Sequence, residues 1–246
     1  MKKLLTYLER EVDRSGVEVV LNKIISADSP ELQKADQIVV AIGADPIFPR
    51  IPGIDRNNVI EVQQAHTSRS NEIKGDRIVV LGGGFSGCEM ALELVQEGKQ
   101  VTLVEMTNKL AAKANPENGA ALRLLLKQHK VTQRLKTKVV AFTEAGVVVE
   151  ADGGGQETIP ADTAIVAFGT RPLADAAREI KAKYPQAVIV GDCTGEVGLV
   201  GDAIHDAYEA VWLFDGDISK KEKYLRKRKT QEKFKLMLSS YIMPHK

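Results

Sequence analysis

Three glycines, Gly82, Gly84 and Gly87, stand in the spacing G-x-G-x-x-G between a β-branched run and a helix-forming run. In this arrangement the first glycine makes a tight turn out of a strand. The second lets the backbone come close to a ligand, and the third lets the helix pack on the strand. The free N–H groups and the positive end of the helix dipole then favour an anion such as a pyrophosphate. The pattern predicts a dinucleotide-binding loop.

The next strand supports this prediction. The run Val101–Val104 reads as a strand and ends on Glu105. A carboxylate at the end of the second strand, roughly twenty residues after the glycines, accepts hydrogen bonds from a ribose hydroxyl. It would repel the 2′-phosphate of NADP, so NAD(H) is favoured over NADP(H). The nearby Lys109 would offset that repulsion only by facing the phosphate, and we interpret it as a solvated loop residue.

Composition excludes several other classes. The chain has 246 residues with 43% hydrophobic and 27% charged content, which is typical of a globular protein. No apolar run approaches the roughly 20 residues of a membrane helix, and a net charge of +1 gives no general reason for nucleic-acid binding. Cys88 and Cys193 lie far apart without a C-x-x-C pattern, which argues against a dithiol pair or a metal site. We therefore expect a cytoplasmic protein that binds neither membranes, metals nor nucleic acid.

The segments around the glycine loop read as alternating helices and strands. Three closely spaced prolines in residues 46–52 predict an extended crossover. One motif occurs on both sides of the glycine loop, at Ile38–Pro46 and at Ile165–Pro172. It consists of an apolar strand, a glycine, a polar turn and a proline. We expect helices over residues 2–14, 116–130 and 173–184 and from Gly201 onward, and strands over 17–21, 36–43, 77–81, 136–150, 161–169 and 187–192.

Four motifs occur in a fixed order along residues 2–214. They are Val-Val-Ala-Ile-Gly-Ala-Asp-Pro at 39–46, the glycine loop with Glu105, Ala-Phe-Gly-Thr-Arg-Pro at 167–172, and Val-Gly-Asp-Cys at 190–193 followed by Asp-Ala-Ile-His. Together they resemble the flavoprotein reductases with two dinucleotide-binding domains. The resemblance is greatest to the C-terminal part of the NADH:flavin oxidoreductase, 2,4-dienoyl-CoA reductase and 2-enoate reductase family.

In such proteins an NAD(P) domain is inserted into an FAD domain, and the resemblance implies cofactor contacts for this chain. Gly82, Gly84, Phe85, Ser86 and Gly87 would hold the nicotinamide dinucleotide, with Glu105 at its adenosine ribose and Glu89 near its nicotinamide end. Gly43 and Gly169 would lie at the two crossovers, Gly191 and Asp192 at the ribitol or pyrophosphate of FAD, and Ala203 and Ile204 at the opening of a helix facing the flavin. No catalytic residue is assigned.

The resemblance also implies the division of the chain. It is an α/β fold in which a Rossmann-like parallel-sheet NAD(P) domain is inserted in a partial FAD-binding α/β domain. The expected parts are residues 1–74 as the first FAD-type segment with the crossover, 75–172 as the NAD(H) domain, 173–215 as the last FAD-type segment, and 216–246 as a basic tail.

One departure bears on FAD. Members of this family begin the FAD domain with a further glycine-rich strand–turn–helix, and residues 1–40 contain none. The family's N-terminal barrel with FMN and its iron–sulfur cysteines have no counterpart either. We therefore expect a whole NAD domain with the second half of an FAD domain. FAD would bind only if the missing half is supplied, by the N-terminal barrel and FAD segment or by a partner subunit.

The implied activity is passage of hydride from NADH to a flavin for reduction of an enoate, enoyl-type or related substrate. Two alternatives stay open. One is an NADH oxidase or ferredoxin reductase-like flavoprotein, and the other is a non-catalytic NAD(H)-binding or docking module. Whether this chain is an enzyme by itself is also open.

Overall fold

The computed structural model describes residues 2–67 and 72–214. They form two compact units, which are described separately. The sheet unit comprises residues 44–172, and the flanking unit comprises the residues up to Gly43 and those from Leu173 onward. Residues 44–74, expected with the first FAD-type segment, pack instead with 75–172, because β3 joins the same sheet as β10. The expected basic tail, 216–246, lies outside the described residues.

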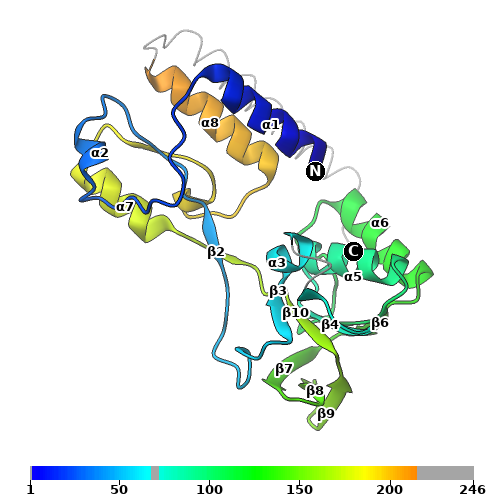
Figure 1. Cartoon of the computed structure of the whole chain (residues 1–246). Coiled ribbons are helices and arrows are strands. Elements are labelled where there is room, and N and C mark those ends of the chain that lie inside the picture. The colour runs from blue at the N-terminus through cyan, green and yellow to red at the C-terminus, as the bar shows by residue number, and fades with distance from the viewer. Residues whose placement is uncertain (1, 68–71, 215–246) are drawn as a thin grey trace, which may run out of the picture. The chain divides into compact units, whose positions relative to one another are not determined.

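A five-stranded parallel sheet forms the centre of the sheet unit, in the order β3-β10-β4-β5-β6 (Figure 1). Its strands are β3 (Val59–Glu61), β4 (Arg77–Leu81), β5 (Gln100–Val104), β6 (Thr132–Arg134) and β10 (Thr163–Val166). Residues 78–81 of β4 are fully buried. A parallel strand that is covered on both faces requires such a continuous apolar run. The predicted α/β, Rossmann-like fold class is confirmed.

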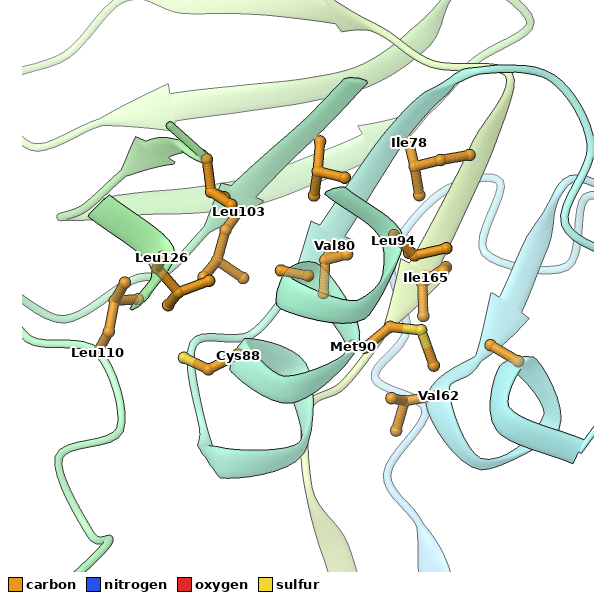
Figure 2. Close-up of a cluster of buried hydrophobic side chains, with 14 of the residues drawn as sticks. Val62, Ile78, Val80, Cys88, Met90, Leu94, Leu103, Leu110, Leu126 and Ile165 are labelled. Atoms are coloured by element: carbon orange, nitrogen blue, oxygen red, sulfur yellow. The ribbon is translucent and has the colours of Figure 1, made fainter. Parts of the chain in front are cut away.

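Helices cover one face of this sheet. They are α3 (Val62–Thr67), α5 (Phe85–Gln96) and α6 (Pro116–Gln128). Successive strand residues point to opposite faces, so Ile78 and Val80 pack with Met90 and Leu94 of α5 (Figure 2). This packing fixes where α5 begins relative to the end of β4.

A small antiparallel sheet contributes the core on the other face, where Val79 and Leu81 pack with Phe142 and Val149. Its strands are β7 (Thr137–Phe142), β8 (Gly146–Ala151) and β9 (Gln156–Pro160), paired in that order. The region expected as a strand over residues 136–150 forms two antiparallel strands, β7 and β8, joined at residues 143–145.

The repeated motif on the two sides of the glycine loop forms a paired structure. β2 (Ala44–Pro46) and β11 (Thr170–Pro172) run antiparallel, with Thr170 opposite Pro46. Each strand follows a glycine with positive φ, Gly43 at +72° and Gly169 at +89°. The two extended segments that enter and leave the sheet unit therefore lie side by side.

The flanking unit has a much smaller core. Its two-stranded parallel sheet pairs Val39 with Val188 and Val40 with Ile189. Its elements are α1 (Lys2–Ser15), α2 (Pro30–Gln33), β1 (Val39–Val40), α7 (Ala174–Lys183), β12 (Val188–Ile189), the 3-10 helix η1 (Gly191–Thr194) and α8 (Val200–Phe214). The expected strand over residues 17–21 is wrong. These described residues form no strand, and their apolar side chains, such as Leu21, are exposed because no neighbouring strand pairs with them.

A carboxylate ties the start of β4 to the start of β10. Asp162 accepts hydrogen bonds from the backbone N–H of Asp76 (3.0 Å) and of Arg77 (2.9 Å) and from the Arg77 guanidinium (3.1 Å to Nε). The guanidinium, together with these N–H groups, holds the pKa of the Asp162 carboxyl well below its usual range.

This pair predicts a pH-dependent stability. A lowered folded-state pKa contributes stability that is present above the unfolded pKa of about 3.9 and is lost as the pH falls through the folded pKa. Asp162→Asn is therefore expected to lower the melting temperature by a constant amount between pH 7 and about pH 4, and by progressively less below that. Thermal unfolding from pH 7 to pH 3 checks this. The exposed Asp55→Asn is the control, and a deficit that does not shrink in acid would contradict the assignment.

Candidate dinucleotide-binding site

The glycine loop joins β4 to α5 through direct backbone contact. Gly82 has a φ of +110°, which favours glycine. A Cβ at Gly87 would lie 1.9 Å from the carbonyl oxygen of Gly82, so the first turn of α5 rests against the end of the strand. Residue types other than glycine do not fit at Gly87. The close helix–strand approach expected from the motif is present.

Gly84 is different, because it faces open space. No atom lies within 4 Å of the place where its Cβ would be, and the residue is exposed. Gly84 is the N-cap of α5, and no side-chain hydrogen bond caps this helix start. Phe85 and Ser86 of the first turn are also exposed. Helix N-termini leave backbone N–H groups without intrahelical partners, so this end offers donors to an anion.

Glu105 lies beside this loop at the end of β5. Its Oε2 accepts a hydrogen bond from Gly83 N–H at 2.6 Å, and its Oε1 accepts one from Thr107 N–H at 2.7 Å. An ionised carboxylate has about four lone-pair positions, so the half-buried side chain keeps acceptor capacity for a ribose. Sequence reasoning missed Thr107, because its contribution is a backbone N–H that any residue type except proline supplies.

Glu89 lies on α5 one turn before Glu93. Partial desolvation raises the pKa of the Glu89 carboxyl above its usual value; His66 of α3 opposes this rise, and the Glu93 carboxylate adds to it. His66 Nδ1 lies 3.3 Å from Glu93 Oε2. Sequence reasoning missed His66 because α3 lies outside the glycine motif.

Cys88 is part of the packing. Its side chain is fully buried, and its Sγ donates to the carbonyl oxygen of Gly83 at 3.4 Å. Burial is the main reason that the pKa of the Cys88 thiol rises to about 11. A thiol in this state is a poor nucleophile.

A second group of candidate residues lies in the flanking unit. The Gly191–Asp192 turn forms the start of η1, and Asp192 Oδ1 accepts from Gly198 N–H at 2.9 Å. Gly191 N–H donates to Oδ2 of Asp206, a residue of α8 that sequence reasoning missed, at 3.2 Å. A Cβ at Gly191 would lie 3.8 Å from Cβ of Ala203.

The helix expected from Gly201 onward is α8, which begins at Val200. A hydrogen bond at the residue just before the helix explains this start. Asp202 Oδ2, in the first turn, accepts from Leu199 N–H at 2.8 Å. Ala203 and Ile204 are therefore already inside the helix, where Ile204 is exposed.

The structure thus gathers the expected residues into two groups, one in each unit. The first group lies on the glycine loop, on α5 and at the end of β5, and consists of Gly82, Gly84, Phe85, Ser86, Gly87, Glu89 and Glu105. The second group lies in the flanking unit and consists of Gly43, Gly191, Asp192, Ala203 and Ile204. Gly169 precedes β11 in the sheet unit. Within residues 2–67 and 72–214, no group of three or more His, Cys, Asp or Glu side chains could hold a metal ion. Over the same residues, no helix has the length and apolar character needed to cross a membrane.

The first group fits a dinucleotide. An open N-cap glycine, an uncapped helix start and a fixed carboxylate at the next strand end are the parts that such a ligand needs. The one glycine-rich strand–turn–helix among the described residues lies in the sheet unit, so the second group has no such loop of its own there. The fold and this site define a Rossmann-like dinucleotide-binding protein.

The chain belongs to the pyridine nucleotide-disulphide oxidoreductase family, whose model matches residues 2–206. Cinnamate reductase of Clostridium sporogenes is 32% identical over 209 residues, which are 84% of this chain and 30% of that protein. NADH oxidase of Thermoanaerobacter brockii is 27% identical, covering 84% of this chain and 32% of that protein. The solved structure of a 2-naphthoyl-CoA reductase is 29% identical with a TM-score of 0.71, covering 83% of this chain and 31% of that one.

These similarities support the class of reaction in outline. The family is that of pyridine nucleotide-disulphide oxidoreductases, and the two relatives are named as a cinnamate reductase and an NADH oxidase. The chain spans about a third of the length of the curated relatives that it matches.

Proposed function

We propose that this chain binds NAD(H) through the glycine loop and Glu105, in preference to NADP(H). The observation that carries the proposal is the Glu105 carboxylate, which the N–H groups of Gly83 and Thr107 hold beside the uncapped start of α5. The pyrophosphate would accept hydrogen bonds from the N–H groups of that start. The ribose hydroxyls would donate to Glu105, whereas a 2′-phosphate would meet a like charge.

We propose further that the chain serves a protein that passes hydride from NADH to a flavin. The flavin, when bound, supplies the ring that accepts the hydride. The residues of this chain position the nucleotide, with Glu89 nearest the nicotinamide end. The sheet unit would be the NAD(H) domain, and Gly43, Gly169, the Gly191–Asp192 turn and the start of α8 would supply one part of an FAD site. The remainder would come from an N-terminal segment or a partner subunit.

The names of the relatives support an enoate, enoyl-type or related final substrate, since cinnamate and 2-naphthoyl-CoA are both unsaturated acyl compounds. The NADH oxidase relative supports the alternative in which electrons go elsewhere. We also propose a cytoplasmic location, on the cysteine usage described above.

A second candidate function is a docking module. It is favoured by the many exposed apolar side chains of the flanking unit, among them Leu21 at 75% and Ile24 at 94% exposure. Exposed apolar surface of this kind marks contact with another protein segment. In this candidate function the chain would bind NAD(H) without passing hydride onward.

Calorimetric titration of the purified chain with NADH, NADPH and FAD, together with its absorbance spectrum, tests these proposals. NADH is expected to bind more tightly than NADPH. Glu105→Ala is expected to weaken NADH binding at least about tenfold, because each hydrogen bond to a charged group contributes about 1.5–3 kcal/mol and 1.4 kcal/mol is tenfold in affinity. Glu144→Ala, at an exposed acid of the same unit, is the control and is expected to bind like the wild type.

Three outcomes separate the candidates. Absence of binding by both NADH and NADPH would exclude a nicotinamide dinucleotide site at the glycine loop. NADH binding without electron transfer to added flavin would favour the docking module. A yellow chain with bound FAD would contradict the expectation that its FAD site is incomplete.

A further inference from the structure

Hydrogen bonds hold the backbone of Gly83 at both its N–H and its carbonyl oxygen. Its N–H donates to Glu105 Oε2 at 2.6 Å, and its carbonyl oxygen accepts from Ala111 N–H at 2.7 Å. Gly83 is buried, and a Cβ there would lie 2.4 Å from Cδ2 of Leu110. The loop of residues 105–111 therefore closes against the glycine loop and carries Glu105 at its start.

This closure includes a strained residue. Ala111 has a φ of +48° and is only 2% exposed. The left-handed conformation is unfavourable for a residue with a Cβ, and it persists only where the surroundings determine it. Backbone hydrogen bonds from Thr137 N–H to the carbonyl oxygen of Glu105 (3.0 Å) and from Lys136 N–H to that of Thr107 (2.9 Å) hold the start of the loop. The turn at residues 110–111 needs an anchor of its own besides the bond from Ala111 to Gly83.

Arg123 of α6 supplies that anchor. Its Nη1 donates to the carbonyl oxygen of Leu110 at 3.1 Å in a half-buried place. The Leu110 side chain is buried in the cluster that also holds Cys88 and Leu126 (Figure 2). A guanidinium is always charged and is a strong donor, so this bond holds the turn at residues 110–111 where Ala111 N–H meets Gly83.

Gly119, one helical turn before Arg123, provides the space for this contact. A Cβ at Gly119 would lie 3.0 Å from Arg123 Nη1 and 3.2 Å from the carbonyl oxygen of Ala111. Glycine inside a helix is less stable than alanine. Its presence in α6 is explained by the approach of the guanidinium and of the loop backbone.

We propose that Arg123 is a positioning residue that sets the choice between NAD(H) and NADP(H). It holds residues 110–111 against Gly83, so that the Glu105 carboxylate stays directed at the adenosine ribose and opposes a 2′-phosphate. The inference rests on the NAD(H) binding proposed above. Without the guanidinium the loop loosens, and Glu105 turns away from both a ribose hydroxyl and a phosphate.

The test measures Kd for NADH and for NADPH with the full chain and with Arg123→Met, together with the melting temperature. Kd for NADH is expected to rise about fivefold, the size expected for one lost hydrogen bond, whereas Kd for NADPH changes less. The ratio of Kd for NADPH to Kd for NADH therefore falls. Arg123→Lys should restore most of the ratio, and Lys127→Met, at an exposed lysine of the same helix, should leave it unchanged.

A ratio that stays constant while both nucleotides bind less tightly would overturn the inference, because a purely structural role weakens both alike. If Arg123→Met does not fold, Gly119→Ala makes the same test, since it displaces the guanidinium and should also lower the ratio. Amide hydrogen exchange at Ala111 gives a ligand-free readout and should be faster in either variant than in the wild type. Failure of the wild type to bind NADH would overturn the proposed function as well, whereas a wild-type ratio kept in all variants overturns this inference alone.

Discussion

Gly87→Ala is expected to destabilise the sheet unit by about 3 kcal/mol or more, the upper end for an overpacked interior. The new Cβ would lie 1.9 Å from the carbonyl oxygen of Gly82 and 3.2 Å from Cβ of Ala167. Neither neighbour is the far end of a flexible side chain. The end of β4 and the first turn of α5 must therefore separate, which also opens the buried cluster around Met90 and Leu94.

Urea or thermal unfolding, followed by circular dichroism, measures this loss. Gly84→Ala is the matched control, because the same methyl group is added three residues earlier in open space, at a φ of −64° that alanine adopts readily. The control is expected to stay within about 1 kcal/mol of the wild type, the usual cost of an alanine N-cap. Equal stability of Gly87→Ala and the control would show that the strand and the helix are not in contact here.

The fold of the sheet unit was largely predictable, because its signals are local. A buried apolar run, glycines at fixed spacing and an acid at the next strand end identify β4, α5 and β5 from adjacent residues. The helices near residues 116–130 and 173–184 are likewise confirmed as α6 and α7. Boundaries were less predictable. β3 has three residues, and its place in the sheet depends on β10, which is distant in the sequence.

The error at residues 17–21 has a different cause. Valine and leucine favour a strand only where a neighbouring strand and a packed face receive them. In the part of the chain that the structure describes, this segment has neither, and its side chains stay exposed. The segment is rich in β-branched residues, but this composition alone does not provide the neighbouring strand that a β-strand needs.

The candidate site was predictable where its chemistry depends on side-chain type. Gly82 and Gly87 are in contact, and Glu105 bonds to Gly83 within the same loop, as the motif requires. Their ligand contacts stay predictions. The support behind Glu105 was not predictable, since it consists of backbone groups of Thr107 and Ala111 and of a guanidinium on a separate helix. The glycine within α6, Gly119, was the one feature of the sequence that could have indicated a close approach there.

Gly84→Asp is expected to change stability and nucleotide binding in opposite directions. Gly84 has the extended backbone of an N-cap, with φ −64° and ψ −176°. An aspartate there can accept a hydrogen bond from the first turn of α5 and places a negative charge at the positive helix end, which should stabilise the fold by about 0.5 kcal/mol. The same carboxylate would occupy the place of the pyrophosphate and repel it.

NADH binding is therefore expected to weaken at least about a hundredfold, since each lost hydrogen bond to a charged phosphate contributes about 1.5–3 kcal/mol and each 1.4 kcal/mol is tenfold. Calorimetry and thermal unfolding on the same preparation measure both effects. Gly84→Asn separates charge from size, because it caps the helix without the negative charge and should bind NADH more tightly than Gly84→Asp. Wild-type affinity in the stable Gly84→Asp chain would place the anion elsewhere than at the start of α5.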